Sequence, residues 1–133
     1  MSILGLLAVA AGLTLATDDA RPNVVIVYAD DMGYTDLGCF GGDLARTPNI
    51  DRMAREGLRL TRYYSASPIC SPSRCGLLTG QFPARWRITS YLQTRAGNRA
   101  CGQDDFLDPE APSLPRALQA AGYATAHVGK WHL

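Results

Sequence analysis

Cys70 and Arg74 place a potential nucleophile one helical turn from a fixed positive charge. A short helix is expected to begin at Pro72, with Ser71 as its cap. Backbone N–H groups at the start of a helix favour an anion, and arginine grips an oxyanion with two donors. The pattern therefore predicts a place for a sulfate or phosphate group above position 70.

The four cysteines allow other interpretations of the same residue. In an exported protein Cys70 could instead be structural, paired with Cys39, Cys75 or Cys101 in a connectivity that the sequence does not determine. A zinc site made of all four is a further alternative, although only Cys70 and Cys75 lie close in sequence. The residues by themselves leave these alternatives open.

Asp30 and Asp31 form an adjacent acidic pair directly after an apolar, β-branched segment, residues 23–29. Neighbouring carboxylates repel each other unless a positive group lies beside them. A hard divalent cation with oxygen ligands is the simplest such partner. The alternative is a pair of solvated loop aspartates, but the buried strand expected before them favours a metal site.

Lys130 and His132 stand two residues apart, just after another apolar segment, residues 123–128. In an extended backbone such residues point the same way. Lysine would bind an anionic oxygen, and histidine could donate a proton or a hydrogen bond to a leaving group. The alternative is a solvated lysine beside a surface histidine.

The elements around these clusters predict an α/β sandwich. Apolar β-branched or alternating patterns indicate strands, and capping residues followed by helical spacing indicate helices. The expected strands are 23–29, 58–64 and 123–128, the expected helices are 47–57, 72–79 and 113–121, and the expected loops are 32–46 and 81–112. Because all three clusters fall where strands end or helices begin, they are expected to converge.

The beginning of the chain resembles a secretory leader. Residues 3–16 are apolar and end in small residues, although no lysine or arginine precedes them. We interpret residues 1–20 as a signal peptide, with a membrane anchor or a buried helix as alternatives, and expect a secreted or periplasmic protein without a stable membrane span. The net charge of +1 argues against nucleic acid as a partner.

Taken together, these residues resemble the sulfatase family that depends on formylglycine. The stretch from Cys70 through Ser73-Arg74 to Leu78-Thr79-Gly80 resembles its modification motif, and Gly129-Lys130-Trp131-His132-Leu133 resembles its second motif. Arg21-Pro22-Asn23 leading to Asp30-Asp31-Met32-Gly33, and Thr47-Pro48-Asn49-Ile50-Asp51, resemble its opening strand and next helix. The resemblance implies an alkaline-phosphatase-like sandwich with a mostly parallel central sheet, of which residues 21–133 form a truncated, N-terminal part.

The same resemblance implies roles for the matching residues. Asp30 and Asp31 would bind calcium, and Cys70 would be oxidised to formylglycine (3-oxoalanine) by the formylglycine-generating enzyme, then serve as calcium ligand and nucleophile. Arg74 would steady this site, and Lys130 and His132 would contact the sulfate and the hydrated aldehyde. The implied activity is hydrolysis of a sulfate ester, with sulfated sugars, aryl sulfates and steroid sulfates all open as substrates.

Oxidation of Cys70 has a chemical rationale. A thiolate that attacked sulfate would leave a sulfur–sulfur bond without an easy internal exit, whereas an aldehyde hydrate carries a second hydroxyl that can expel sulfate. The family's remaining calcium ligands lie downstream of these motifs, so the 133 residues alone are expected to be inactive. Two alternatives are a phosphonate or phosphate ester hydrolase of the same superfamily, and a non-catalytic secreted fragment stabilised by disulfides or zinc.

Overall fold

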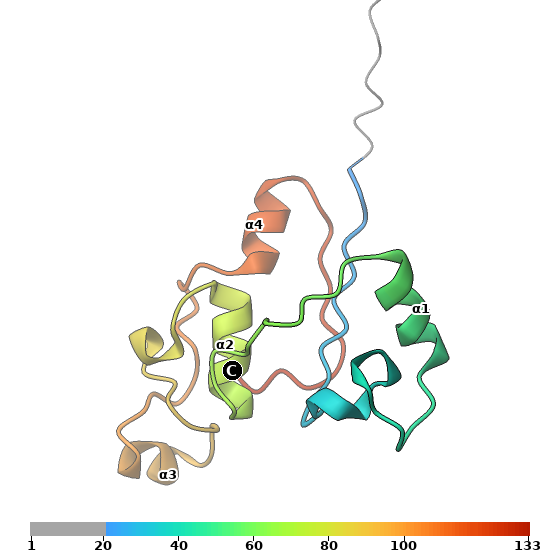
Figure 1. Ribbon diagram of the computed structural model, residues 1–133. Helices are drawn as coiled ribbons and strands as arrows, with labels where there is room; N and C mark the ends of the chain where they lie inside the picture. The colour runs from blue at the N-terminus through green and yellow to red at the C-terminus, as the bar shows by residue number, and fades with distance from the viewer. Residues whose placement is uncertain (1–20) are drawn as a thin grey trace, which may run out of the picture.

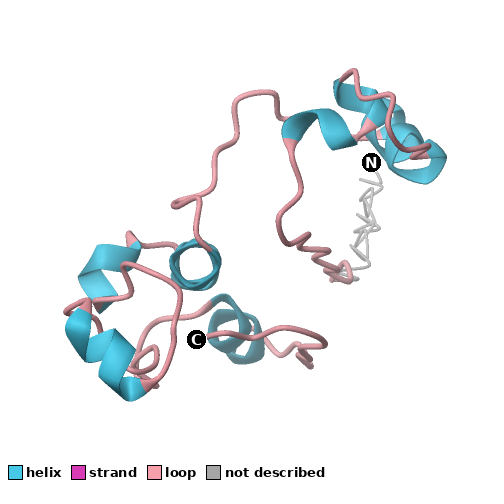
Figure 2. Ribbon diagram, turned by 90° about the horizontal axis from the view of Figure 1, so that it is seen from below, coloured by secondary structure: helices cyan, strands magenta, loops and turns pink. Residues whose placement is uncertain are grey.

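The computed structural model describes residues 21–133, so the predicted signal peptide lies outside the described residues. Its helices are α1 (Pro48–Glu56), α2 (Cys70–Thr79), α3 (Arg95–Ala100) and α4 (Leu114–Ala120), with the 3-10 turns η1 (Tyr34–Asp36), η2 (Gly38–Phe40) and η3 (Pro83–Trp86). α2 packs against η3 and α4, whereas α1 packs against η2 (Figure 1). Figure 2 shows α1 and its turns set apart from the group formed by the other helices.

Two of the predicted helices are confirmed. α1 begins with Pro48, whose fixed φ suits a first helical position, and ends before Gly57. α4 follows Ser113, whose side chain accepts a hydrogen bond from the Arg116 N–H at 3.4 Å. Proline and capping residues act within one turn of the chain, which is why local sequence was sufficient to predict these two helices.

The start of α2 differs from the prediction by two residues. The helix begins at Cys70, not Pro72, and Ile69 is its N-cap without a side-chain capping bond. The Ser71 hydroxyl does not cap the helix, because it accepts a hydrogen bond from the distant Leu92 N–H at 3.0 Å. Cys70 therefore lies inside the first turn of α2.

The three predicted strands, and with them the parallel sheet, are not confirmed: residues 21–133 contain no strand. A strand requires ladder hydrogen bonds to a neighbour, and none joins these extended segments to one another. Two of them nevertheless run side by side in the same direction (Figure 1). Arg21 donates to the Ala121 carbonyl, and Asp30 pairs with Lys130, so the two segments are aligned in parallel at both ends.

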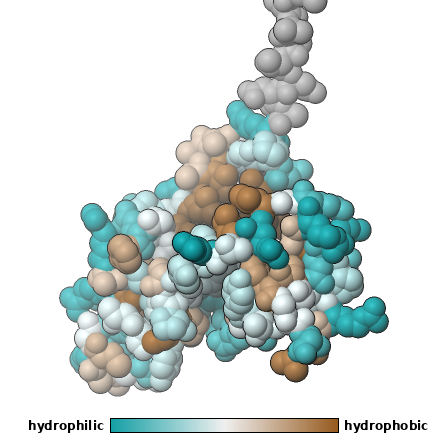
Figure 3. All heavy atoms as spheres, viewed as in Figure 1, coloured by the Kyte–Doolittle hydropathy of each residue, from teal (hydrophilic) through white to brown (hydrophobic). Residues whose placement is uncertain are grey.

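Apolar side chains on these extended segments face solvent. Val25, Val27 and Val128 are 84%, 89% and 95% exposed, and Figure 3 shows apolar surface in the middle of this face, between α4 and α1. Such residues are normally buried in a sheet.

None of the described helices is long and apolar enough to cross a bilayer.

The segment 81–112, predicted as an irregular surface excursion, contains η3 and α3. Ile88 is fully buried within it, and so are two polar side chains, Asn98 and Gln103, which are 1% and 5% exposed. The prediction of a loop was wrong here because the segment is organised by hydrogen bonds of these amides, and such bonds leave no periodic apolar pattern.

Candidate active site

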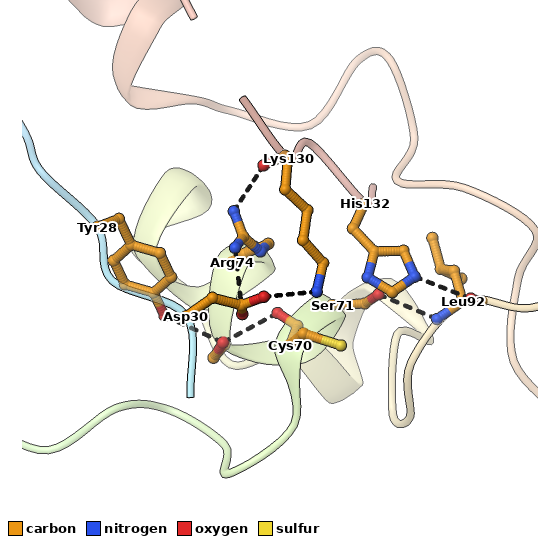
Figure 4. Close-up of polar contacts among 9 residues, drawn as sticks. Tyr28, Asp30, Cys70, Ser71, Arg74, Leu92, Lys130 and His132 are labelled. Atoms are coloured by element: carbon orange, nitrogen blue, oxygen red, sulfur yellow. Dashed lines mark hydrogen bonds and ion pairs between the residues drawn. The ribbon is translucent and has the colours of Figure 1, made fainter. Parts of the chain in front are cut away.

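All the predicted site residues except Asp31 gather at the N-terminal end of α2 (Figure 4). Cys70 is the first residue of this helix and is partly exposed, and its carbonyl accepts a hydrogen bond from the Ser73 hydroxyl at 2.9 Å. The first N–H groups of a helix lack partners within the helix and favour negative charge. Position 70 thus combines access from solvent with a local preference for an anion.

Arg74 lies one turn along α2 and is only 8% exposed. Its Nη1 donates to the Lys130 carbonyl at 2.6 Å, and its Nη2 lies 3.3 Å from the Asp30 carboxylate. The guanidinium also stacks over the Tyr28 ring, 5.2 Å from its centre. Arg74 therefore ties three segments of the chain together, as a planar fork with several donors can and an ammonium cannot.

The Asp30 carboxylate lies between two cations. Its second oxygen accepts a hydrogen bond from the Lys130 ammonium at 2.7 Å. This hydrogen bond, with a smaller contribution from Arg74, holds the pKa of Asp30 below its usual 3.8, and the same contact raises the pKa of Lys130 above 10.5. Both groups are thus charged across the physiological range, and the predicted convergence of Asp30, Arg74 and Lys130 is confirmed.

Asp31 stands apart from this ion-pair network. Its backbone is in the left-handed region, with φ of 54°, a conformation that aspartate tolerates better than most residues. Within residues 21–133 no three or more acidic, histidine or cysteine side chains lie close enough to hold a metal together. The two aspartates offer oxygen donors suited to calcium, but too few of them for its usual six to eight ligands.

His132 adopts a geometry that the sequence did not predict. Its φ is 58°, so the segment from Lys130 to His132 is not fully extended. The ring Nε2 lies 2.9 Å from the Leu92 carbonyl, which can only accept, so Nε2 carries the proton. Nδ1 is buried without a partner among the described residues, and in the neutral ring it is an acceptor. In the neutral ring Nδ1 can therefore accept a proton, and the predicted donation to a leaving group requires that Nδ1 first receives one.

Sequence reasoning missed three contributors to this site. Tyr28 donates to the Ser73 hydroxyl at 3.0 Å and supports Arg74; its place two residues before Asp30, on the same side of an extended segment, was an available signal. Ser71 is fully buried and is bound by the Leu92 N–H. Leu92 acts through its main chain, so its residue type carried no signal.

All four cysteines are free in the structure. Cys75 is fully buried in α2, and this burial raises the pKa of its thiol. Cys101 is exposed and Cys39 is partly exposed. The alternative interpretation in which Cys70 is held in a disulfide has no support from this arrangement.

The ion pair of Asp30 and Lys130 predicts a specific pH dependence. A lowered Asp30 pKa stabilises the fold fully above pH 3.8, and this contribution is lost as the pH falls through the lowered value. A raised Lys130 pKa stabilises it fully below pH 10.5, and this contribution is lost as the pH rises through the raised value. In calcium-free buffer, Lys130→Met should shift the Asp30 titration midpoint, followed by NMR of its carboxyl carbon, upward toward 3.8. An unchanged midpoint would show that the contact does not persist in solution.

The order of these residues along the chain matches a known family. The family model described as Sulfatase matches residues 22–133. The chain belongs to the sulfatase family.

Several sulfatases are similar to this chain along most of its length. Mouse (Mus musculus) steryl-sulfatase is 41% identical over 139 residues, covering 95% of this chain and 21% of the relative. Human (Homo sapiens) arylsulfatase H is 42% identical, covering 88% and 21%. Pig (Sus scrofa) N-acetylgalactosamine-6-sulfatase is 45% identical, covering 93% and 24%. The chain thus spans about a fifth of the length of the curated sulfatases it matches, and the family implies an alkaline-phosphatase-like fold.

Proposed function

We propose that this chain contributes the nucleophile and the anion-binding side chains of a sulfuric ester hydrolase. The observation that carries this proposal is the convergence of Asp30, Arg74 and Lys130 beside Cys70 at the first turn of α2. The relatives named for steryl sulfate, aryl sulfate and N-acetylgalactosamine 6-sulfate share sulfate ester chemistry. A sulfate ester, from a sugar, aryl alcohol or sterol, is therefore the proposed substrate class.

Cys70 is proposed to become formylglycine, whose hydrated aldehyde supplies the attacking hydroxyl and a second hydroxyl for release of sulfate. Support comes from the free, partly exposed thiol at this position and from its place in the first helical turn. The formylglycine-generating enzyme is the proposed partner in maturation. Such maturation fits a secreted or periplasmic protein, the location proposed for this chain.

Calcium is the proposed metal, held by Asp30, Asp31 and the oxidised side chain at position 70. When bound, it would neutralise charge on the sulfate oxygens. Contacts from Lys130 and Arg74 keep Asp30 ionised, as a metal ligand must be. Because these donors are too few for calcium, we propose that further ligands come from polypeptide beyond this chain and that the 133 residues alone are inactive.

Lys130, Arg74 and His132 are proposed to act on the substrate in different ways. Lys130 presents an ammonium group at the site, suited to an anionic sulfate oxygen, and Arg74 holds the carbonyl of that residue in place. His132 presents an unprotonated Nδ1 in its neutral form, since Nε2–H is engaged by Leu92. This nitrogen can take a proton from a hydroxyl at position 70 and return it to a leaving oxygen.

A comparison of esters tests this function. The full-length enzyme, meaning a polypeptide of the relatives' length that carries this chain, should be produced with the formylglycine-generating enzyme and assayed with aryl sulfate and aryl phosphate. We expect kcat/KM for the sulfate to be at least about tenfold higher, because the relatives are named for sulfate esters and an enzyme discriminates between esters by differential binding of their transition states. A preference for the phosphate would assign the chain to the alternative ester class.

A further inference from the structure

The main chain of Leu92 links two parts of the proposed site. Its N–H donates to the buried Ser71 hydroxyl at 3.0 Å, and its carbonyl lies 2.9 Å from the His132 Nε2 (Figure 4). Ser71 directly follows the proposed nucleophile in α2. One residue of the segment between η3 and α3 therefore connects the residue after position 70 with the imidazole.

Leu92 is held by two buried amide side chains. The Gln103 Oε1 accepts from the Ser90 N–H at 2.8 Å, and its Nε2 donates to the Tyr91 carbonyl at 3.0 Å. On the other side of Leu92, the Gln93 N–H donates to the Asn98 Oδ1 at 2.8 Å. Gln103 and Asn98 thus hold the main chain on both sides of Leu92, and these two buried amides form a bracket around it. The N–H and carbonyl of Leu92 itself remain for Ser71 and His132.

The bracket is closed by contacts between the amides. The Gln103 Nε2 also donates to the Asn98 Oδ1 at 3.0 Å, and the Asn98 Nδ2 donates to Asp105 at 3.0 Å. Asn98 belongs to α3, so this short helix anchors the bracket. Because Asn98 and Gln103 are almost completely buried, loss of one partner leaves the others unsatisfied in a low-dielectric setting.

We propose that Asn98 and Gln103 are positioning residues for catalysis, acting through the Leu92 main chain on Ser71 and His132. This inference rests on the function proposed above. The bracket fixes the tautomer of His132, because it aims the Leu92 carbonyl at Nε2 and leaves Nδ1 as the base. It also fixes the first turn of α2 through the Ser71 hydroxyl.

The test compares Gln103→Met and Gln103→Glu with Gln119→Met in the full-length enzyme. Gln103→Met removes all three hydrogen bonds of the amide at similar length. Gln103→Glu keeps an acceptor for Ser90 but turns a second oxygen toward the Tyr91 carbonyl and Asn98 Oδ1. Gln119→Met is the matched control, because this amide is exposed and, within residues 21–133, bonds only to Thr125.

Two readouts separate positioning from a general loss of structure. We expect both Gln103 variants to lower kcat about 10-fold to 100-fold with KM changed by less than about threefold, since small misplacement of a catalytic group has effects of this size. We also expect the ¹⁵N signals of the His132 ring, which distinguish the protonated from the unprotonated nitrogen, to move toward mixed tautomers. The control should match the wild type in both.

Unchanged kcat in a folded Gln103 variant would overturn the inference, and so would a lower kcat with an unaltered His132 ring signal. If Gln103→Met does not fold, Gln103→Glu decides the matter by the same two readouts. Absence of sulfate ester hydrolysis in the wild type would refute the proposed function instead. The ring signals of His132 would still show whether the bracket controls its tautomer.

Discussion

Cys70→Ala is expected to abolish hydrolysis of sulfate esters by the full-length enzyme, lowering kcat by about 10⁴-fold or more, as removal of a nucleophile does in other enzymes. Alanine cannot be oxidised to an aldehyde, so no hydroxyl would be available to attack sulfur. Position 70 is partly exposed at the first turn of α2, so the loss should not reflect a collapsed core. The measurement is steady-state turnover of an aryl sulfate.

Cys101→Ser provides the matched control for this substitution. Cys101 is exposed, and in the described part of the chain its sulfur accepts only a weak contact from Gln93 at 3.6 Å. Its replacement should leave kcat within about twofold of the wild type, as for most exposed positions. Equal and large losses in both variants would point to cysteine chemistry unrelated to a nucleophile. Full activity of Cys70→Ala would remove the proposed role of this residue.

Arg74→Lys is expected to lower kcat/KM by about 10²-fold to 10³-fold, the range seen when one fixed donor is removed from an active site. The charge is retained, but a single ammonium cannot bind both the Lys130 carbonyl and Asp30 while covering the Tyr28 ring. The Lys130 carbonyl would lose a buried partner, and the free energy of unfolding should fall by about 1–3 kcal/mol. Turnover of an aryl sulfate and urea unfolding measure the two effects.

Arg95→Lys is the matched control for Arg74→Lys. Arg95 is 85% exposed and lies 3.7 Å from Asp105, and exposed ion pairs contribute little to stability, about 1 kcal/mol or less. We expect neither readout to change appreciably for this variant. Activity of Arg74→Lys equal to that of the control would mean that the guanidinium does not organise the site.

The sequence predicted which charged residues meet better than it predicted the fold around them. Asp30 and Lys130 each follow an apolar segment, and Arg74 lies one turn after Cys70, so their expected places at strand ends and at a helix start predicted that they would meet. Helices α1 and α4 were predictable because proline and serine act on the backbone within one turn. The segment 23–29 has the composition of a strand, but a strand also requires a hydrogen-bonded neighbour, which composition does not supply.

The structure of residues 81–112, which contain α3, could not be predicted for a different reason. Asn98 and Gln103 are polar residues in a polar stretch, and such residues are usually exposed, so nothing in their type indicated burial. Leu92 holds Ser71 and His132 through main-chain atoms that every residue except proline possesses. The tautomer of His132 likewise depends on a carbonyl forty residues away in the chain, a relation that only the structure reveals.

The most direct test of the account is the mass of the peptide that contains position 70, taken from the full-length protein after production with the formylglycine-generating enzyme. We expect this peptide to be lighter than the unmodified cysteine peptide, because the CH2–SH side chain of cysteine becomes the CHO group of formylglycine. The same peptide should react with an aldehyde-specific hydrazide. An unmodified thiol at residue 70, or a disulfide between Cys70 and another cysteine, would contradict the account.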